Sequence, residues 1–115
     1  MIKINESNVT IMVKDLDISI RFYESIGLTL KIRWENHYAV VETAGITLGL
    51  HPSENKEPGS GTLSIGFMVD SIAEATEMLE KIRITCKIDD GKSGKYLHFK
   101  DSDGTSLYFV EPKWK

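Results

Sequence analysis

Cysteine is nearly absent from the sequence, and this absence limits the class of protein. The single cysteine, Cys86, has no second cysteine to pair with, so a small scaffold stapled by disulfides is excluded. Cys86 alternates with Ile84 and Ile88, a pattern that is typical of a buried structural thiol and not of a nucleophile. A reducing compartment suits this composition, and we expect a cytoplasmic protein.

Long apolar runs and clusters of positive charge are also missing. No segment approaches the roughly 20 consecutive apolar residues that span a bilayer, so we expect no membrane partner. Charged residues make up 27% of the chain, the net charge is -3, and the basic residues do not gather in one stretch. This composition does not favour binding to nucleic acid.

Two segments of the chain share one pattern, 56 positions apart (residue 64 against residue 8). Residues 8–13 read Asn-Val-Thr-Ile-Met-Val, and residues 64–69 read Ser-Ile-Gly-Phe-Met-Val. In both, alternate residues are apolar, as in a half-buried strand, and an amphipathic helix follows. The repeat predicts two copies of one β-α-β-β-β module. At 115 residues, we expect the copies to share one domain, residues 1–115.

Each predicted module contains one helix with recognisable ends. The first helix starts after Asp15 or Asp17 and closes at Gly27, which suits a left-handed C-terminal cap. The second starts after Ser71, because Glu74 three residues later completes a capping-box signature. The predicted strands cover residues 8–13, 28–34, 38–42, 46–51, 63–69, 84–89, 96–100 and 105–110.

The segment 52–61 is the predicted linker between the modules. It holds two of the three prolines and two glycines, and nothing in it packs a core. Module one then covers about residues 1–51, and module two covers about residues 62–115.

Alternation along the strands predicts one face of each sheet that does not meet a helix. In the segment 28–34 the even-numbered residues are apolar, while the odd-numbered ones include Lys31 and Arg33, which predicts one apolar and one basic face. If the two sheets stand side by side, the faces without a helix are expected to line a concave cup. They contain Asn8, Thr10, Met12, Thr47, Gly49, His51, Ser64, Gly66, Met68, Tyr96, His98, Ser106 and Tyr108.

Short motifs near the start and the end of the chain carry a family resemblance. They are Val-Lys-Asp-Leu-Asp at 13–17, Phe22-Tyr23, Gly27-Leu28, Phe-Lys-Asp-Ser-Asp-Gly at 99–104 and Glu111-Pro112. With the internal repeat, they resemble the glyoxalase/bleomycin-resistance/dioxygenase group, the vicinal oxygen chelate superfamily, over nearly the whole chain. The resemblance implies an α+β fold in which two tandem β-α-β-β-β modules form a cup-shaped open barrel. It also implies a homodimer.

The resemblance further implies a metal site, and this chain fills its positions poorly. Active members usually bind a divalent metal through His, Gln or Glu on the first and last strands of each module. Divalent transition metals prefer imidazole, thiolate or carboxylate ligands. The matching positions in this chain are Asn8, Gly49, Ser64 and Tyr108, none of which is a ligand of this kind. We therefore expect no metal and no other cofactor, with a divalent metal held by His51 and His98 as the alternative.

Without metal ligands, the cup is expected to take a small organic molecule. Gly49 and Gly66 leave room for a ligand, and the side chains of Met12 and Met68 adapt to irregular ligand shapes. Tyr108 adds an aromatic wall; in the alternative reading, its ring only fills the space of the cup. Arg33 is expected to reach the rim. The predicted ligand-binding residues are Asn8, Met12, Arg33, Gly49, His51, Ser64, Met68, His98 and Tyr108.

Three functions remain open from the sequence, and no catalytic residue is assigned. The first is a metal-free protein that binds a small, partly aromatic molecule in the cup, for sequestration or antibiotic resistance, as the resemblance implies. The second is a glyoxalase-type lyase or isomerase, or a dioxygenase-related enzyme, with a non-standard site. The third is a non-catalytic interaction module whose cup is filled by Tyr108 and the two methionines.

Overall fold

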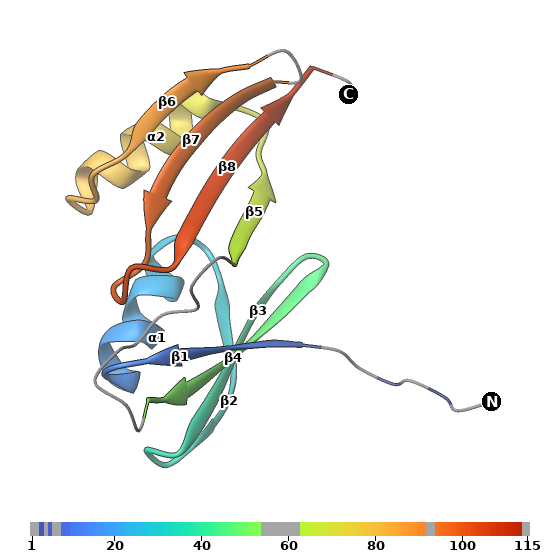
Figure 1. The fold of residues 1–115 in the computed structure, drawn as a ribbon, viewed down its shortest axis with the longest axis vertical. Helices are drawn as coiled ribbons and strands as arrows, with labels where there is room; N and C mark the ends of the chain where they lie inside the picture. Colours follow the sequence, from blue (N-terminus) through green and yellow to red (C-terminus); the bar gives the residue numbers. More distant parts are fainter. Residues whose placement is uncertain (1–2, 4, 6–7, 54–62, 92–93, 114–115) are drawn as a thin grey trace. The chain divides into compact units, whose positions relative to one another are not determined.

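The computed structural model describes residues 3, 5, 8–53, 63–91 and 94–113, which form two helices and eight strands (Figure 1). In chain order the elements are β1 (Val9–Val13), α1 (Leu16–Ser25), β2 (Thr29–Trp34), β3 (Tyr38–Thr43), β4 (Ile46–Pro52), β5 (Ser64–Met68), α2 (Ile72–Lys81), β6 (Lys87–Asp90), β7 (Gly94–Lys100) and β8 (Ser106–Pro112).

The chain divides into two compact units, residues 1–60 and 61–115, and each holds one helix and one four-stranded sheet. The strand orders are β1-β4-β3-β2 and β5-β8-β7-β6, with the first and last strands of each unit parallel and the other pairs antiparallel. The predicted α+β class and the repeated β-α-β-β-β order are confirmed. The cup that both sheets would form together and the single domain stay predictions, and most of the predicted linker lies outside the described residues.

In the first unit, α1 packs against β2, β3 and β4 and covers one face of their sheet. Ile11 and Val13 of β1 are fully buried, while Met12 between them is 39% exposed. Burial therefore alternates along β1 as the sequence predicted, because successive side chains of a strand point to opposite faces. The buried face of the sheet is completed by Leu48 and Leu50 of β4.

The second unit repeats this arrangement with α2 against β7 and β8. Leu79 of α2 is fully buried, and it lies on the helix face predicted from the spacing of the apolar residues. The strands supply Leu97, Phe99, Leu107 and Phe109 to this core, and each of them is almost completely buried.

Both helices begin where the sequence predicted, and α1 ends before Gly27 as predicted. Asp15 caps α1, because its Oδ1 accepts a hydrogen bond of 3.1 Å from the Ile18 backbone N–H. Ser71 caps α2 in the same way, with its Oγ 3.1 Å from the Glu74 backbone nitrogen. Gly27 follows α1 with φ of +112°, a conformation that glycine adopts at little cost.

Strand boundaries in the second unit differ from the prediction. Strand β6 begins at Lys87 and not at residue 84, because the chain that leaves α2 is still tied to the helix. Arg83 adopts φ of +61°, and the Ile84 N–H donates to the Leu79 carbonyl oxygen at 2.9 Å. Strand β7 begins two residues earlier than expected, and β8 continues to Pro112, two residues beyond the predicted end of this strand.

The alternation predicted for β2 is wrong, because the strand contains an irregularity at Lys31. Leu30 pairs with Val41 of β3, but Ile32 pairs with the next residue, Val40, so the register shifts between them. A β-bulge of this kind reverses the face of every residue that follows it. Ile32 and Trp34 are accordingly 53% and 65% exposed and do not join the core.

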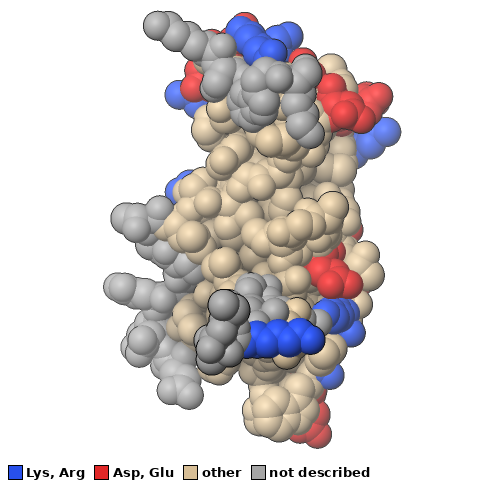
Figure 2. Space-filling model, turned by 90° about the vertical axis from the view of Figure 1, so that its right-hand side faces the viewer, with Lys and Arg blue, Asp and Glu red and all other residues tan. Residues whose placement is uncertain are grey.

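Neither described helix is long and apolar enough to cross a membrane. On the face of the molecule drawn in Figure 2, acidic and basic side chains are interspersed, and the described residues there form no large patch of one sign.

The N-terminal cap of α2 is open to a direct test. Replacing Ser71 by alanine removes the acceptor for the Glu74 N–H, and we expect the free energy of unfolding to fall by about 1 kcal/mol. The measurement is urea denaturation followed by circular dichroism. Ser102→Ala, at an exposed turn position, is the matched control and should change stability by less than about 0.5 kcal/mol. Equal stability of the two variants would contradict the capping role.

Candidate functional site

The open face of each sheet, defined as the face opposite its helix, gathers most of the predicted site residues. In the first sheet, Thr10 lies beside Gly49 and Met12 beside His51. In the second sheet, Tyr108 lies between Gly66 on β5 and His98 on β7. The predicted residues found on the open faces are Met12, Gly49 and His51 in the first sheet, and Ser64, Met68, His98 and Tyr108 in the second.

Two of the predicted polar residues in the first unit have defined partners. Asn8 precedes β1, and its Oδ1 accepts a hydrogen bond of 3.4 Å from the Thr10 hydroxyl. The Nδ1 atom of His51 lies 2.8 Å from the Pro52 carbonyl oxygen. Because a carbonyl oxygen only accepts, Nδ1 carries the proton in this contact, and Nε2 is the acceptor atom of the neutral ring.

The space beside Gly49 is taken by a tyrosine that the sequence did not point to. A Cβ atom at position 49 would lie 2.1 Å from Tyr38 Oη and 2.7 Å from Thr10 Oγ1. Glycine is therefore required here for close approach of Tyr38. The available signal was the glycine itself, since a glycine inside a strand often marks a position that a neighbouring aromatic ring covers.

Gly66 plays the same part in the second sheet, under the ring of Tyr108. A Cβ atom at position 66 would lie 2.1 Å from Tyr108 Cζ and 2.4 Å from its Cε2. The Tyr108 ring thus lies over the backbone of the neighbouring strand at Gly66. This is the contact expected if Tyr108 fills space on the open face.

Each open face carries a tyrosine–histidine pair, with His51 on β4 in the first sheet and His98 on β7 in the second. The rings of Tyr38 and His51 have centroids 6.4 Å apart, and those of Tyr96 and His98 are 6.1 Å apart and nearly parallel. In the second sheet Tyr108 completes a cluster of three rings, 5.7 Å from Tyr96 and 6.2 Å from His98. These separations lie in the range of favourable aromatic contacts. Such clusters present flat, polarisable surfaces on which a planar molecule can stack.

The equivalence of the two tyrosines follows from strand register. Ala39 pairs with Leu50, and Leu97 pairs with Phe109, at matching places of the repeat. Tyr38 and Tyr96 each precede the first member of their pair by one residue. The structure therefore adds Tyr38 and Tyr96 to the candidate site, although neither was a predicted ligand-binding residue.

Arg33, which was expected at the rim of the cup, lies on the opposite side of its sheet from Gly49. After the bulge at Lys31, Arg33 pairs with Ala39, whose side chain is in the core face. Its guanidinium forms an ion pair with Asp17 of α1 and donates from Nε to the Glu35 carbonyl oxygen at 2.8 Å. Arg33 is thus engaged in holding helix α1 to β2, and we leave it out of the candidate site.

Cys86 is half-buried, between α2 and β6. Burial raises the pKa of its thiol, and the nearby Glu80 carboxylate raises this pKa further. A raised pKa disfavours the nucleophilic thiolate, in agreement with a structural thiol.

Comparison with known proteins decides the family. The model of the Glyoxalase/Bleomycin resistance protein/Dioxygenase superfamily matches residues 7–109. The chain belongs to this superfamily. An uncharacterized protein of Mycolicibacterium smegmatis is 31% identical over 106 residues, which cover 90% of both chains.

Solved structures of the superfamily have the same fold. The genomically encoded fosfomycin resistance protein FosX of Listeria monocytogenes matches with a TM-score of 0.79 at 20% identity, over 96% of this chain and 93% of its own. A bleomycin-binding protein complexed with bleomycin matches with a TM-score of 0.71 at 16% identity, over 96% of this chain and 100% of its own. At these identities the likeness concerns the fold alone.

A divalent metal, which many superfamily members use, does not suit the donor atoms of this chain. Gly49 offers no side chain, the Tyr108 ring is packed over Gly66, and Asn8 and Ser64 are neutral. Among the described residues, no group of three or more His, Cys, Asp or Glu side chains is arranged to hold a metal ion. His51 and His98, the alternative predicted pair, belong to different units, and no third ligand accompanies either of them in the described part of the chain.

The contact between Gly66 and Tyr108 predicts a cost for a single methyl group. Gly66→Ala would force the Tyr108 ring from its place, and we expect the free energy of unfolding to fall by about 1–3 kcal/mol. Gly91→Ala is the matched control, because its Cβ would meet nothing closer than 3.6 Å. Chemical denaturation measures both variants. If Gly66→Ala is as stable as Gly91→Ala, the ring is not held over the glycine.

The raised pKa of Cys86 predicts slow alkylation. We expect the rate of reaction with iodoacetamide to rise at a higher pH in the folded protein than in the unfolded chain, because the thiolate reacts and burial disfavours it. Glu80→Gln should move the folded-state profile to lower pH. Glu77→Gln is the matched control, because the Glu77 carboxylate pairs with Lys81. This variant should leave the pH profile unchanged. Identical profiles for the folded and unfolded chains would show that the thiol is not perturbed.

Proposed function

We propose that this superfamily member is a binding protein that holds a small, planar, partly aromatic organic molecule on the open faces of its sheets, without a metal. The observation that carries the proposal is the presence of a tyrosine–histidine pair on each of the two open faces, with the two tyrosines at equivalent places of the repeat. Tyr38 with His51 and Tyr96 with His98 offer stacking surfaces that also carry hydrogen-bonding atoms.

The two methionines on the open faces support the same reading. Met12 and Met68 occupy matching positions of the repeat, and their side chains are 39% and 56% exposed. Methionine side chains adapt their shape to a ligand and make favourable contacts with aromatic rings. Exposed methionine on the same face as aromatic rings is a composition suited to an apolar, planar molecule.

A role in sequestration fits this chemistry better than a role in catalysis. The rings and methionines supply binding surface, while Gly49 and Tyr108 replace ligand positions with packing groups. The bleomycin-binding protein with the same fold is named for binding of this kind. We therefore propose capture of a small organic compound, such as an antibiotic, as the function of the chain, and we extend the proposal to a homodimer.

The experiment is a binding screen in the presence of a metal chelator. Planar heteroaromatic compounds are tested for an increase in melting temperature, and the affinity of each hit is measured by calorimetry. Met12→Glu and Met68→Glu each place a charge where the apolar ligand is expected. We expect at least one of them to weaken binding by roughly tenfold or more, because a bound apolar ligand would desolvate the carboxylate.

Ile18→Glu is the matched control. Ile18 is an exposed apolar residue on α1, so the same charge is added away from the open face. Its affinity for the ligand should equal that of the parent chain. Unchanged affinity in both methionine variants contradicts binding on the open faces. Binding that the chelator abolishes contradicts the metal-free part of the proposal.

A further inference from the structure

The open face of the first sheet is ordered in two rows of side chains that cross all four strands. Directly paired residues form the first row, which contains, from β1 to β2, Thr10, Gly49, Val40 and Ile32. The second row contains, in the same order, Met12, His51, Tyr38 and Trp34. Because residues directly opposite each other project to the same face of a sheet, the open face continues as far as the edge strand β2.

The bulge at Lys31 determines which residues of β2 lie on this face. With Leu30 opposite Val41, a regular strand would place Ile32 opposite the buried Ala39, on the face that meets the helix. The shift of register places Ile32 opposite Val40 instead, and it sends Arg33 to the helix side. The bulge thus replaces a cation on the open face by two apolar side chains, Ile32 and Trp34.

Ile32 and Trp34 are exposed, although both are large apolar side chains. Each is more exposed than Met12 at the other end of the rows, whereas Gly49 and Val40 between them are buried. The indole ring of Trp34 contacts the ring of His37, with 5.3 Å between the centroids. The outer end of the open face is therefore an aromatic and aliphatic surface that the fold itself does not cover.

The width of the rows suits a ligand of more than one ring. Neighbouring strands lie about 4.8 Å apart, so the two outer strands of a four-stranded row are separated by about 14 Å. A flat molecule of two or three fused rings can reach from Met12 on β1 toward Trp34 on β2. A single ring can contact only part of this surface.

The two rows contain no Asp, Glu, Lys or Arg among their eight residues. Beside them, Glu42 pairs with Thr47, and its carboxylate lies 3.9 Å from the Lys31 ammonium group. The charge of Glu42 is therefore compensated within the sheet. A charged ligand group placed on the rows would lose its hydration without gaining an ionic partner, so the surface favours an uncharged molecule.

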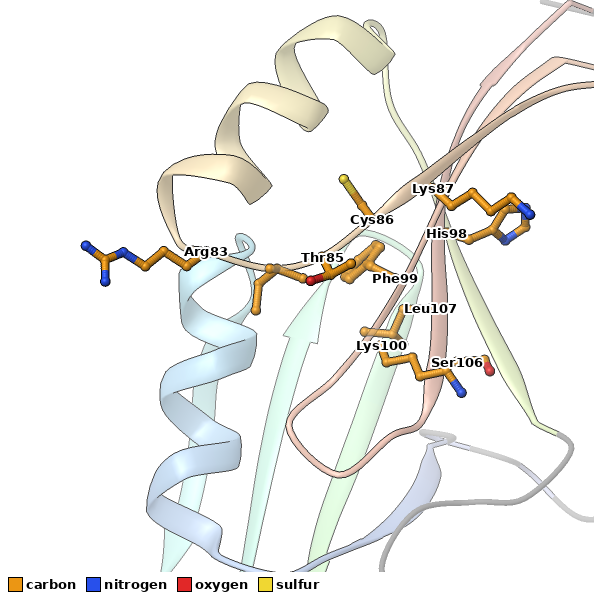
Figure 3. Close-up of a pocket in the computed structure, with 10 residues that line it drawn as sticks. Arg83, Thr85, Cys86, Lys87, His98, Phe99, Lys100, Ser106 and Leu107 are labelled. Atoms are coloured by element: carbon orange, nitrogen blue, oxygen red, sulfur yellow. The ribbon is translucent and has the colours of Figure 1, made fainter.

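The second sheet differs at the equivalent edge. There the row that contains Tyr108 and His98 ends at Lys87, and the row that contains Tyr96 ends at Asp89. Figure 3 shows the side chains of Lys87, His98, Lys100 and Ser106 projecting to the same side of this sheet. The edge of the second open face is thus charged, while the edge of the first is apolar.

We infer that the ligand is an uncharged molecule of two or three fused aromatic rings, that it lies on the first sheet, and that Ile32 and Trp34 select it. The inference rests on the proposed function and adds the charge, the size and the location of the ligand. The Trp34 ring and the Ile32 side chain contact one end of the molecule, and Met12 contacts the other.

The test compares two probes that share one ring system and differ in charge. The ¹⁵N-labelled full chain is titrated at neutral pH with phenazine-1-carboxamide and, separately, with phenazine-1-carboxylate, and peak shifts are followed by NMR. We expect the amide to bind saturably, with shifts of the Trp34 indole N–H and of the Ile32 and Gly49 backbone amides. It should bind at least about fivefold more tightly than the carboxylate.

The variants test the two edge residues directly. Trp34→Ala should weaken binding of the carboxamide by about tenfold, while Trp34→Phe, which keeps a ring, should stay within about threefold of the parent chain. Ile32→Glu should weaken it by about tenfold. Ile88→Glu is the matched control, because Ile88 is 55% exposed on the edge strand β6 but pairs with the buried Leu97, on the helix side of its sheet. Its affinity should stay within about twofold of the parent chain.

Four outcomes contradict the inference. The first is tighter binding of the carboxylate, and the second is equal weakening by Ile32→Glu and Ile88→Glu. The third is binding that Met68→Glu weakens while Ile32→Glu and Trp34→Ala do not, which places the ligand on the second sheet and supports the proposed function. The fourth is a Trp34→Ala variant with unchanged affinity and an altered oligomeric state, which makes the β2 edge a contact between copies of the chain. Absence of saturable binding by both probes also overturns the inference, whereas the proposed function is decided by its own wider screen.

Discussion

One constraint governs each module: a four-stranded sheet has two faces, and its own module supplies one helix to cover them. In β1 this constraint divides the strand residue by residue, with Ile11 and Val13 fully buried against the helix side and Met12 on the other face. The apolar burial stabilises the fold, and fixes the register, because a slip of one residue would exchange the faces. The face without a helix is then not constrained by packing against the helix.

On that face of each sheet, a tyrosine ring covers a glycine, but the glycine lies on a different strand in each module. In the first sheet the glycine is on β4, beside Thr10 of β1, and Tyr38 reaches over it. In the second sheet the glycine is on β5, and Tyr108 of β8 covers it. In both cases an aromatic ring covers the backbone at a glycine, which has no side chain of its own. The ring can lie there only because the residue is glycine.

The sequence predicted those features that depend on periodicity and on local capping. The repeat, both helix caps and the buried residues of β1 follow from such short-range rules. The bulge at Lys31 was not predictable in this way, because the alternation in 28–34 is regular and the shift is visible only in the pairing with β3. The error moved Arg33 to the wrong face. Tyr38 was missed for a related reason, since its contact with Gly49 joins two strands through their register.

The packing of Tyr108 over Gly66 links the chemistry of the open face to its stability. A carboxylate at position 108, one of the positions that the family resemblance assigns to metal ligands, would be too small and too polar to cover the backbone at Gly66. A larger residue at position 66 would in turn displace the ring. Each residue makes the other hard to change alone, so the introduction of a metal ligand at position 108 requires a compensating change on β5. The aromatic surface on this sheet is therefore held in place by packing, whatever molecule it binds.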